Sequence, residues 1–237
     1  MKKIIFAFIT LFLITVSLTA QEINKMDGAG KRHGRWKGTY DTSKRLRYEG
    51  TFDHGKETGT FKFFEDNEAS TLAATRVFAK DGSCYTTFYD EKGKKLAEGK
   101  EVNRLKEGEW KLYHPGGEAI MAVENYSNGK LNGTRKVFFP NKNLAEEVNN
   151  VNGLKEGAYK QYTEKGVVLE ESVYKNNQLH GLVIFRNGHG EIITKGKFED
   201  NKQTGVWQYF EKGKMVKQED KTNKKVQLAR KERKKVN

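Results

Sequence analysis

Few residues of this chain combine the types and the spacing that chemistry requires. Its five histidines are far apart in the sequence, at His33, His54, His114, His180 and His189. No two of them have the short spacing typical of a zinc site, and no cysteine pair is present to complete one. Most stand beside glycines or in turn sequences, so we interpret them as ordinary turn residues and expect no bound metal.

Neighbouring carboxylates occur twice, at Glu146-Glu147 and Glu170-Glu171. Adjacent side chains on a strand point to opposite faces of a sheet, so neither pair is expected to act as a general acid and base. The chain has no nucleophile elbow, phosphate-binding loop or dinucleotide fingerprint. It therefore predicts a protein that is not an enzyme and that has no cofactor.

Cys84 is the only cysteine, so no intramolecular disulfide can form. It stands at a position of an internal repeat where the other copies have glycine. We interpret it as a small side chain that is tolerated there, in preference to a reactive thiol.

The repeat itself is the strongest signal in the chain. A motif of glycine, any residue, an aromatic residue, two further residues and a second aromatic residue returns every 24 or 25 residues. Its anchor positions are Gly34, Gly59, Cys84, Gly108, Gly133, Gly157, Gly181 and Gly205. A fixed period in this range is typical of a repeat array, in which each unit contacts only its neighbours.

Each repeat reads as two short strands and two turns. In the unit that begins at Gly108, residues 109–113 alternate between polar and apolar, a turn cluster with Pro115 follows, and a second apolar run ends at Asn128-Gly129. Asn-Gly accepts the positive φ angles of a type I′ hairpin turn. The predicted fold class is all-β: an elongated antiparallel meander of about eight two-stranded β-hairpin repeats, with an N-terminal signal helix and a basic tail.

An aromatic column is expected two residues after the anchors, at Trp36, Phe61, Trp110, Tyr159 and Trp207. We favour this column as the core because a single hairpin is marginal in water and each unit must bury apolar surface. A binding platform for sugars or peptides stays open as the alternative. Thr86, Arg135 and Val183 interrupt the column, so we expect the middle of the array to be less firmly packed than its ends.

The two ends of the chain have other compositions. Residues 1–20 combine Lys2 and Lys3 with an apolar run, which predicts a secretory signal peptide cleaved between Ala20 and Gln21. An uncleaved inner-membrane anchor is the alternative. Residues 21–33 are expected to be a linker and residues 34–220 the array.

The tail, residues 221–237, carries a net charge of +7 out of +13 for the whole chain. Such basic blocks are usually disordered or weakly helical and contact polyanions, so an anionic membrane surface is an expected partner. The tail has no aromatic residue for stacking on bases, and we expect no nucleic acid. Beyond Lys221, its basic residues are Lys224, Lys225, Arg230, Lys231, Arg233, Lys234 and Lys235.

Residues 48–61, Tyr-Glu-Gly-Thr-Phe-Asp-His-Gly-Lys-Glu-Thr-Gly-Thr-Phe, resemble the MORN consensus. The resemblance extends more loosely over residues 98–110 and 196–207, and the array covers about four fifths of the chain. The aromatic-rich copies are most similar to bacterial MORN-variant repeats, a group labelled YwqK-type antitoxin proteins. The resemblance implies an elongated, twisted sheet used for binding or assembly, with membrane association in some relatives.

These observations together predict an exported, non-enzymatic binding or scaffolding module of the cell envelope, in the periplasm, the outer envelope or the medium. We expect its partner to be a protein or an envelope polymer. One alternative is an antitoxin-like partner that neutralises a toxin, and another is a protein that binds envelope carbohydrate or acts on it. Choline-binding cell-wall repeats have a shorter period and Gly-Trp dipeptides, which this chain lacks.

Overall fold

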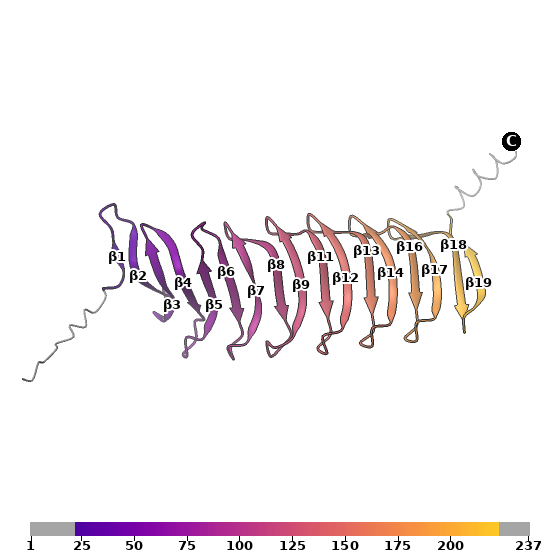
Figure 1. Cartoon of the computed structure of the whole chain (residues 1–237), viewed down its shortest axis with the longest axis horizontal. Coiled ribbons are helices and arrows are strands. Elements are labelled where there is room, and N and C mark those ends of the chain that lie inside the picture. The colour runs from indigo at the N-terminus through magenta and orange to yellow at the C-terminus, as the bar shows by residue number, and fades with distance from the viewer. Residues whose placement is uncertain (1–21, 223–237) are drawn as a thin grey trace, which may run out of the picture.

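The structure, a computed structural model, describes residues 22–222, and within them it is a single antiparallel β-sheet without helices (Figure 1). Consecutive strands pair along the chain, and the sheet does not close. The expected all-β meander of hairpins is confirmed. The strands are β1 (Lys25–Met26), β2 (Arg32–Thr39), β3 (Leu46–Asp53), β4 (Lys56–Phe64), β5 (Leu72–Phe78), β6 (Cys84–Tyr89), β7 (Lys95–Val102), β8 (Leu105–Tyr113), β9 (Ile120–Ser127), β10 (Lys130–Leu131), β11 (Gly133–Phe138), β12 (Leu144–Val151), β13 (Leu154–Tyr162), β14 (Val168–Lys175), β15 (Gln178–Leu179), β16 (Gly181–Arg186), β17 (Ile192–Glu199), β18 (Lys202–Glu211) and β19 (Lys214–Asp220).

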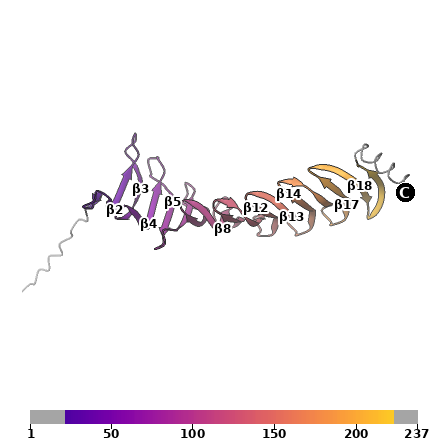
Figure 2. The ribbon, with the colours of Figure 1, turned by 90° about the horizontal axis from the view of Figure 1, so that it is seen from above.

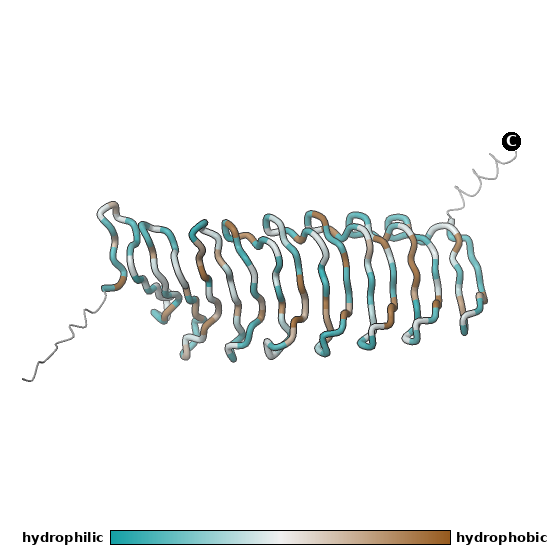
Figure 3. The backbone as a smooth tube through the Cα atoms, in the orientation of Figure 1, coloured by the Kyte–Doolittle hydropathy of each residue, from teal (hydrophilic) through white to brown (hydrophobic). Residues whose placement is uncertain are grey.

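The sheet forms one layer and is long in the direction in which the strands follow one another (Figure 1). Seen from above, the ribbon twists along its length (Figure 2). Hydrophobic and hydrophilic residues are interspersed along most of the strands (Figure 3). Between residues 22 and 222, no helix is long and apolar enough to span a membrane.

Tight two-residue turns join the strands along one edge of the sheet. In six of them both central residues have positive φ, which is the conformation expected for type I′ turns. The predicted role of the Asn-Gly sequences in these turns is confirmed. The turns lie at His54-Gly55, Asn103-Arg104, Asn128-Gly129, Asn152-Gly153, Asn176-Asn177 and Asp200-Asn201.

The anchor glycines form a β-bulge at the start of their units. Between the pairs Thr51↔Thr58 and Glu49↔Lys62, β3 advances by two residues while β4 advances by four. The two extra residues surround Gly59, whose φ of 63° suits glycine best. The same offset of two residues recurs around Gly108, Gly133, Gly157, Gly181 and Gly205, all with positive φ.

Cys84 is the one anchor that is not glycine, and the bulge is absent there. Its φ is not positive, and β5 and β6 pair without an offset from Ala74↔Phe88 to Phe78↔Cys84. The preceding turn also differs, because Gly82 has positive φ and Asp81 does not. A side chain at the anchor thus coincides with loss of the bulge.

The two aromatic positions of the motif lie on opposite faces of the sheet, because the second comes three positions after the first and side chains alternate along a strand. We call the face that carries Trp36, Phe61, Trp110, Tyr159 and Trp207 the aromatic face, and the other the charged face. On the aromatic face, the rings cover glycines of the preceding strand. A Cβ built on Gly50, Gly99 or Gly196 would lie 2.4 Å from the ring of Phe61, Trp110 or Trp207.

Burial of the aromatic column is confirmed for four of its five members. Phe61 and Trp110 have no exposed surface, Trp207 is 2% exposed and Tyr159 is 7% exposed, whereas Trp36 at the end of the sheet is half-buried. A second ring packs edge-on against each buried one, as in Phe52–Phe61, Trp110–Tyr126, Tyr159–Tyr174 and Phe198–Trp207.

The expectation of a loosely packed middle is wrong. Thr86 and Val183 are 0% and 1% exposed, because β-branched side chains fill the space beside the neighbouring rings. Arg135 donates to Glu124 at 2.9 Å and to Glu146 at 3.0 Å, so an ion-pair network replaces the missing ring. The less buried part of the aromatic column is its N-terminal end at Trp36, because the outer neighbour of β2 is only the two-residue strand β1.

Strand β1 lies within the segment expected to be a linker, so part of 21–33 belongs to the sheet. Asn24 extends this contact, since its side chain donates to the carbonyl of Lys37 and accepts from its amide. At the other end, the amide of Lys221 donates to the carbonyl of Gly205 at 2.8 Å. The expected signal segment 1–20, with its cleavage residues Ala20 and Gln21, and the tail from 223 onward lie outside the described residues.

Candidate binding surface

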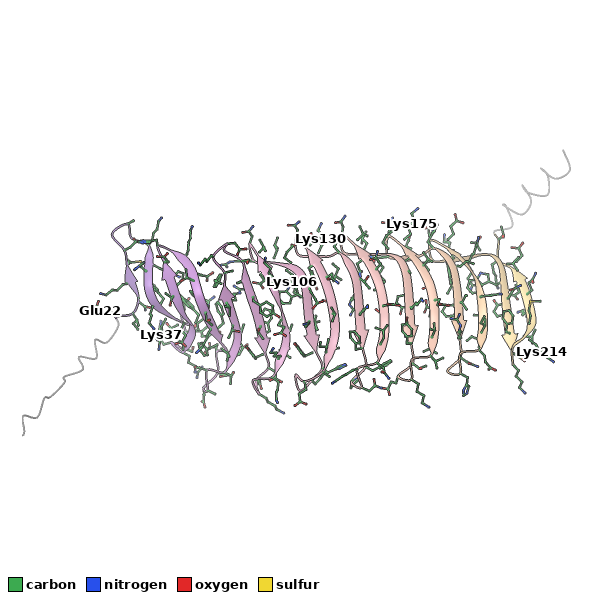
Figure 4. The ribbon with its side chains drawn as sticks, viewed as in Figure 1. Glu22, Lys37, Lys106, Lys130, Lys175 and Lys214 are labelled. Carbon is green, nitrogen blue, oxygen red and sulfur yellow. The ribbon has the colours of Figure 1, made fainter. Side chains whose placement is uncertain are left out.

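One row of mostly charged side chains crosses the charged face from β2 to β19, beginning at Lys37, which is labelled in Figure 4. Each member is directly opposite the next in the strand register, so lysines and glutamates alternate over much of the sheet. We call it the central row. Its members are Lys37, Glu49, Lys62, Thr75, Thr87, Glu98, Lys111, Val123, Lys136, Glu147, Lys160, Glu171, Ile184, Lys195, Gln208 and Gln218.

Ion pairs connect several neighbours of the central row. Glu49 lies 3.7 Å from the Nζ of Lys37 and 3.5 Å from that of Lys62, and Lys160 lies 3.6 Å from Glu171. The lysine side chains of these pairs are 41–50% exposed. Exposed pairs of this kind contribute only about 0–1 kcal/mol each, so the row is chiefly a charge pattern displayed to solvent.

The second aromatic position of the motif supports the glutamates of the central row. The Tyr162 hydroxyl donates to Glu147 at 2.7 Å, and the Tyr113 hydroxyl donates to Glu98. Burial and the Glu147 carboxylate together raise the pKa of Tyr162 to about 12. In the unit with Arg186 at this position, its guanidinium donates to Glu171 at 2.6 Å and lowers the pKa of that carboxyl. These contacts fix where each negative charge lies.

A groove of about 760 Å³ opens on the charged face near the C-terminal end of the sheet. Its floor is apolar, with Leu182 62% exposed and Val206 47% exposed, and Ile184 of the central row also lines it. Lys195 and Lys197 line it as cross-strand partners of Ile184 and Leu182. Glu199 also lines the groove, so its wall carries two positive charges against one negative charge. An apolar floor beside this net positive charge suits a segment that carries both apolar and acidic side chains.

A second cleft, of about 410 Å³, spans β3 to β7. Aromatic side chains and two arginines line it: Tyr40, Phe63, Phe88, Tyr89, Arg47 and Arg76. Arg47 lies 5.8 Å from the centre of the Tyr40 ring, and Arg76 lies 5.4 Å from that of Phe63. Flat rings and guanidinium groups are the side chains that stack on planar or ring-shaped ligands.

The structure brings together two histidines that are far apart in the sequence. The rings of His33 and His54 are 4.7 Å apart, with Asp53 beside both. Antiparallel pairing of β2 with β3, with Gly34 opposite Phe52, places the turn after β3 beside His33, so a separation of 21 residues hid the contact. His180 instead lies against Asp200 at 3.2 Å, and His114 contacts the carbonyl of Phe138 at 2.9 Å.

The structure also places the adjacent pair Glu146-Glu147 and the single cysteine. Glu146 is on the aromatic face beside Arg135, and Glu147 is on the charged face beside Tyr162, so this pair does not converge. Cys84 is buried, its Sγ lies 3.7 Å from Glu101, and burial raises the pKa of its thiol. Such a thiol is a weak nucleophile at neutral pH.

The central row was missed in the sequence, although a signal exists. Its members fall three residues after the anchors, as Lys62, Lys111, Lys136 and Lys160 do, with a glutamate ten before several anchors. The more conspicuous period of the aromatic residues masks this second period in the sequence.

Comparison with known proteins adds no relative: no family model and no curated protein matches the chain.

Proposed function

We propose that this protein is an exported, non-enzymatic repeat protein of the MORN type that acts as a binding or scaffolding module in the cell envelope. The observation that carries the proposal is the charged face: a broad single-layer surface whose central row is ordered by the repeat and whose C-terminal end opens into a groove. Apart from the cleft that spans β3 to β7, the aromatic face is mostly buried core, which leaves the charged face as the main surface for a partner.

The chemistry of the groove favours a protein partner. Leu182, Ile184 and Val206 supply apolar contact area, while Lys195 and Lys197 supply positive charge beside it. A peptide segment with apolar and acidic residues would cover both. An antitoxin-like role, in which the bound partner is a toxin, is one form of the same activity.

The proposal is tested by photo-crosslinking in the native host. A photoreactive phenylalanine analogue at Leu182 is expected to give a discrete protein adduct, whereas one at Val77, equally on the charged face but distant from the groove, gives less. Changing Lys195 and Lys197 to Glu should remove the Leu182 adduct by reversing the charge of the wall. Absence of an adduct at both positions would refute binding through this face.

The aromatic cleft supports a second candidate, binding of envelope carbohydrate. Phe63, Phe88 and Tyr89 expose ring surface next to Arg47 and Arg76. Retention of the purified protein on envelope polysaccharide, lost in the variant Phe88→Ala but kept in Leu182→Ala, would favour this candidate over the groove.

A further inference from the structure

Two histidines and two aspartates meet at the N-terminal end of the sheet, where β1, β2 and the β3–β4 turn come together. His33 is on β2, Asp53 ends β3, His54 opens the turn, and Asp27 follows β1 directly. The position is defined by the backbone, because the amide of Gly55 donates to the carbonyl of Arg32 at 2.8 Å.

The inner atoms of this cluster have the spacing of metal ligands. Asp53 Oδ1 lies 3.6 Å from His33 Nδ1 and 3.9 Å from His54 Nε2, and one ligand atom from each residue lies within 4.8 Å of the others. Ligands at 2.0–2.2 Å around a tetrahedral ion are separated by roughly 3.4 Å, so small side-chain movements would close the site. All three side chains are about half exposed or more, which lets an ion reach them.

Asp27 supplies the outer partner that a metal-binding histidine usually has. Its Oδ2 lies 2.6 Å from His54 Nδ1, and because a carboxylate accepts, the proton stays on Nδ1 and Nε2, 3.9 Å from Asp53 Oδ1, keeps its lone pair for a metal. The carboxylate is itself held by the amides of Ala29 and Lys31, each at 2.9 Å.

We propose that His33, His54 and Asp53 bind a divalent transition-metal ion of the Zn²⁺ type, and that Asp27 positions His54 for it. Two imidazoles and one carboxylate are ligands that Zn²⁺, Co²⁺, Ni²⁺ and Cu²⁺ share. The two aspartates balance the charge of the ion. Three protein ligands leave a fourth position open to water or to a ligand group from a partner.

The repeat provides an internal comparison at its other end. His180 precedes Gly181 as His33 precedes Gly34, and Asp200 stands in its turn where His54 stands in the first. The pair His180–Asp200 therefore has the same backbone setting with only one imidazole. This position should not hold the ion tightly, and it supplies the matched control.

The test is a competition between untagged protein, residues 21–237, and a chromophoric chelator for Zn²⁺. The wild type should bind one ion per chain. His54→Asn should weaken binding at least tenfold and Asp27→Asn by about 10–100-fold, the usual effect of losing an outer-shell carboxylate. His180→Asn should bind like the wild type. Asn is suited to position 54, because it occupies the same place in the turns at Asn103, Asn128 and Asn152.

Histidine ring NMR signals give a second readout. Added Zn²⁺ should shift or broaden those of His33 and His54 and leave those of His180 and His189 in place, and thermal melts should show that each variant is folded. Equal affinity in the wild type and in the double variant His33→Asn/His54→Asn would overturn the proposal. So would equal shifts at all the histidines, which would indicate nonspecific surface binding.

Discussion

The close contact of Gly99 with Trp110 yields the sharpest stability prediction. A Cβ on Gly99 would lie 2.4 Å from Cδ2 and 2.5 Å from Cε2 of the indole, far inside the optimum carbon–carbon distance of about 3.5–4.0 Å. Gly99 does not have positive φ, so the backbone itself would accept alanine. The variant Gly99→Ala therefore isolates the cost of displacing the ring.

The expected magnitude follows from two losses. Overpacking a filled site costs about 1–3 kcal/mol. A displaced indole also weakens the 2.9 Å hydrogen bond from Trp110 Nε1 to the carbonyl of Lys100, worth about 1 kcal/mol. Replacement of glycine by alanine also has an opposite effect. It stabilises the folded state by about 0.4–1 kcal/mol, because it reduces the conformational entropy of the unfolded chain. We expect Gly99→Ala to lower the free energy of unfolding by about 1–3 kcal/mol as the net of these terms.

Urea unfolding followed by circular dichroism would measure this cost, with Gly188→Ala as the control. Gly188 has no atom within 4 Å of a built Cβ and no positive φ, so its variant should match the wild type or exceed it slightly. The decisive measurement is a double-mutant cycle with Trp110→Ala. In that background the ring is gone, and Gly99→Ala should become neutral or stabilising. An unchanged cost there would refute the steric explanation.

Four further predictions follow from the fold and the ends of the chain. Trp110→Ala and Trp207→Ala should each lower the free energy of unfolding by about 3–5 kcal/mol, and Trp36→Ala by clearly less, measured by urea unfolding. Because the pKa of Tyr162 is raised to about 12 in the folded protein, the stability it contributes should be complete below pH 10 and lost as pH rises through 12; Tyr162→Phe should flatten this part of the pH profile. Mass spectrometry of the envelope-localised protein should find an N-terminus at Gln21, and a cytoplasmic protein that keeps Met1 would contradict export. Removing residues 223–237 should leave the melting temperature unchanged and abolish most salt-sensitive retention on anionic vesicles, unless the sheet itself binds them.

The fold could be predicted from the sequence because every unit repeats the same pattern of strand and turn residues. Asn128-Gly129 predicted its turn, and the spacing of Trp110, Tyr159 and Trp207 predicted the buried column. These features are local, so a single chain contains all the information they need. The sixteen long strands expected from the pattern are present, and three two-residue strands are added where bulges divide a longer one or where β1 covers the end.

Features that depend on register between strands were not predicted. The contact between His33 and His54 requires the offset of β2 against β3, and the central row requires that of all the strands together. Arg135 looked like an interruption because its partners, Glu124 and Glu146, are eleven residues away on either side. A one-residue error in register would move each of these side chains to the other face.

The single-layer sheet also fixes how far apart its two ends are. Neighbouring strands lie about 4.7–4.9 Å apart, so each two-strand unit adds about 10 Å and the path from β2 to β19 is roughly 70 Å along the sheet. The histidine cluster at one end and the groove at the other are therefore held at nearly opposite limits of the molecule. Partners that occupied both would be kept at a set separation, and the number of repeats would determine that distance.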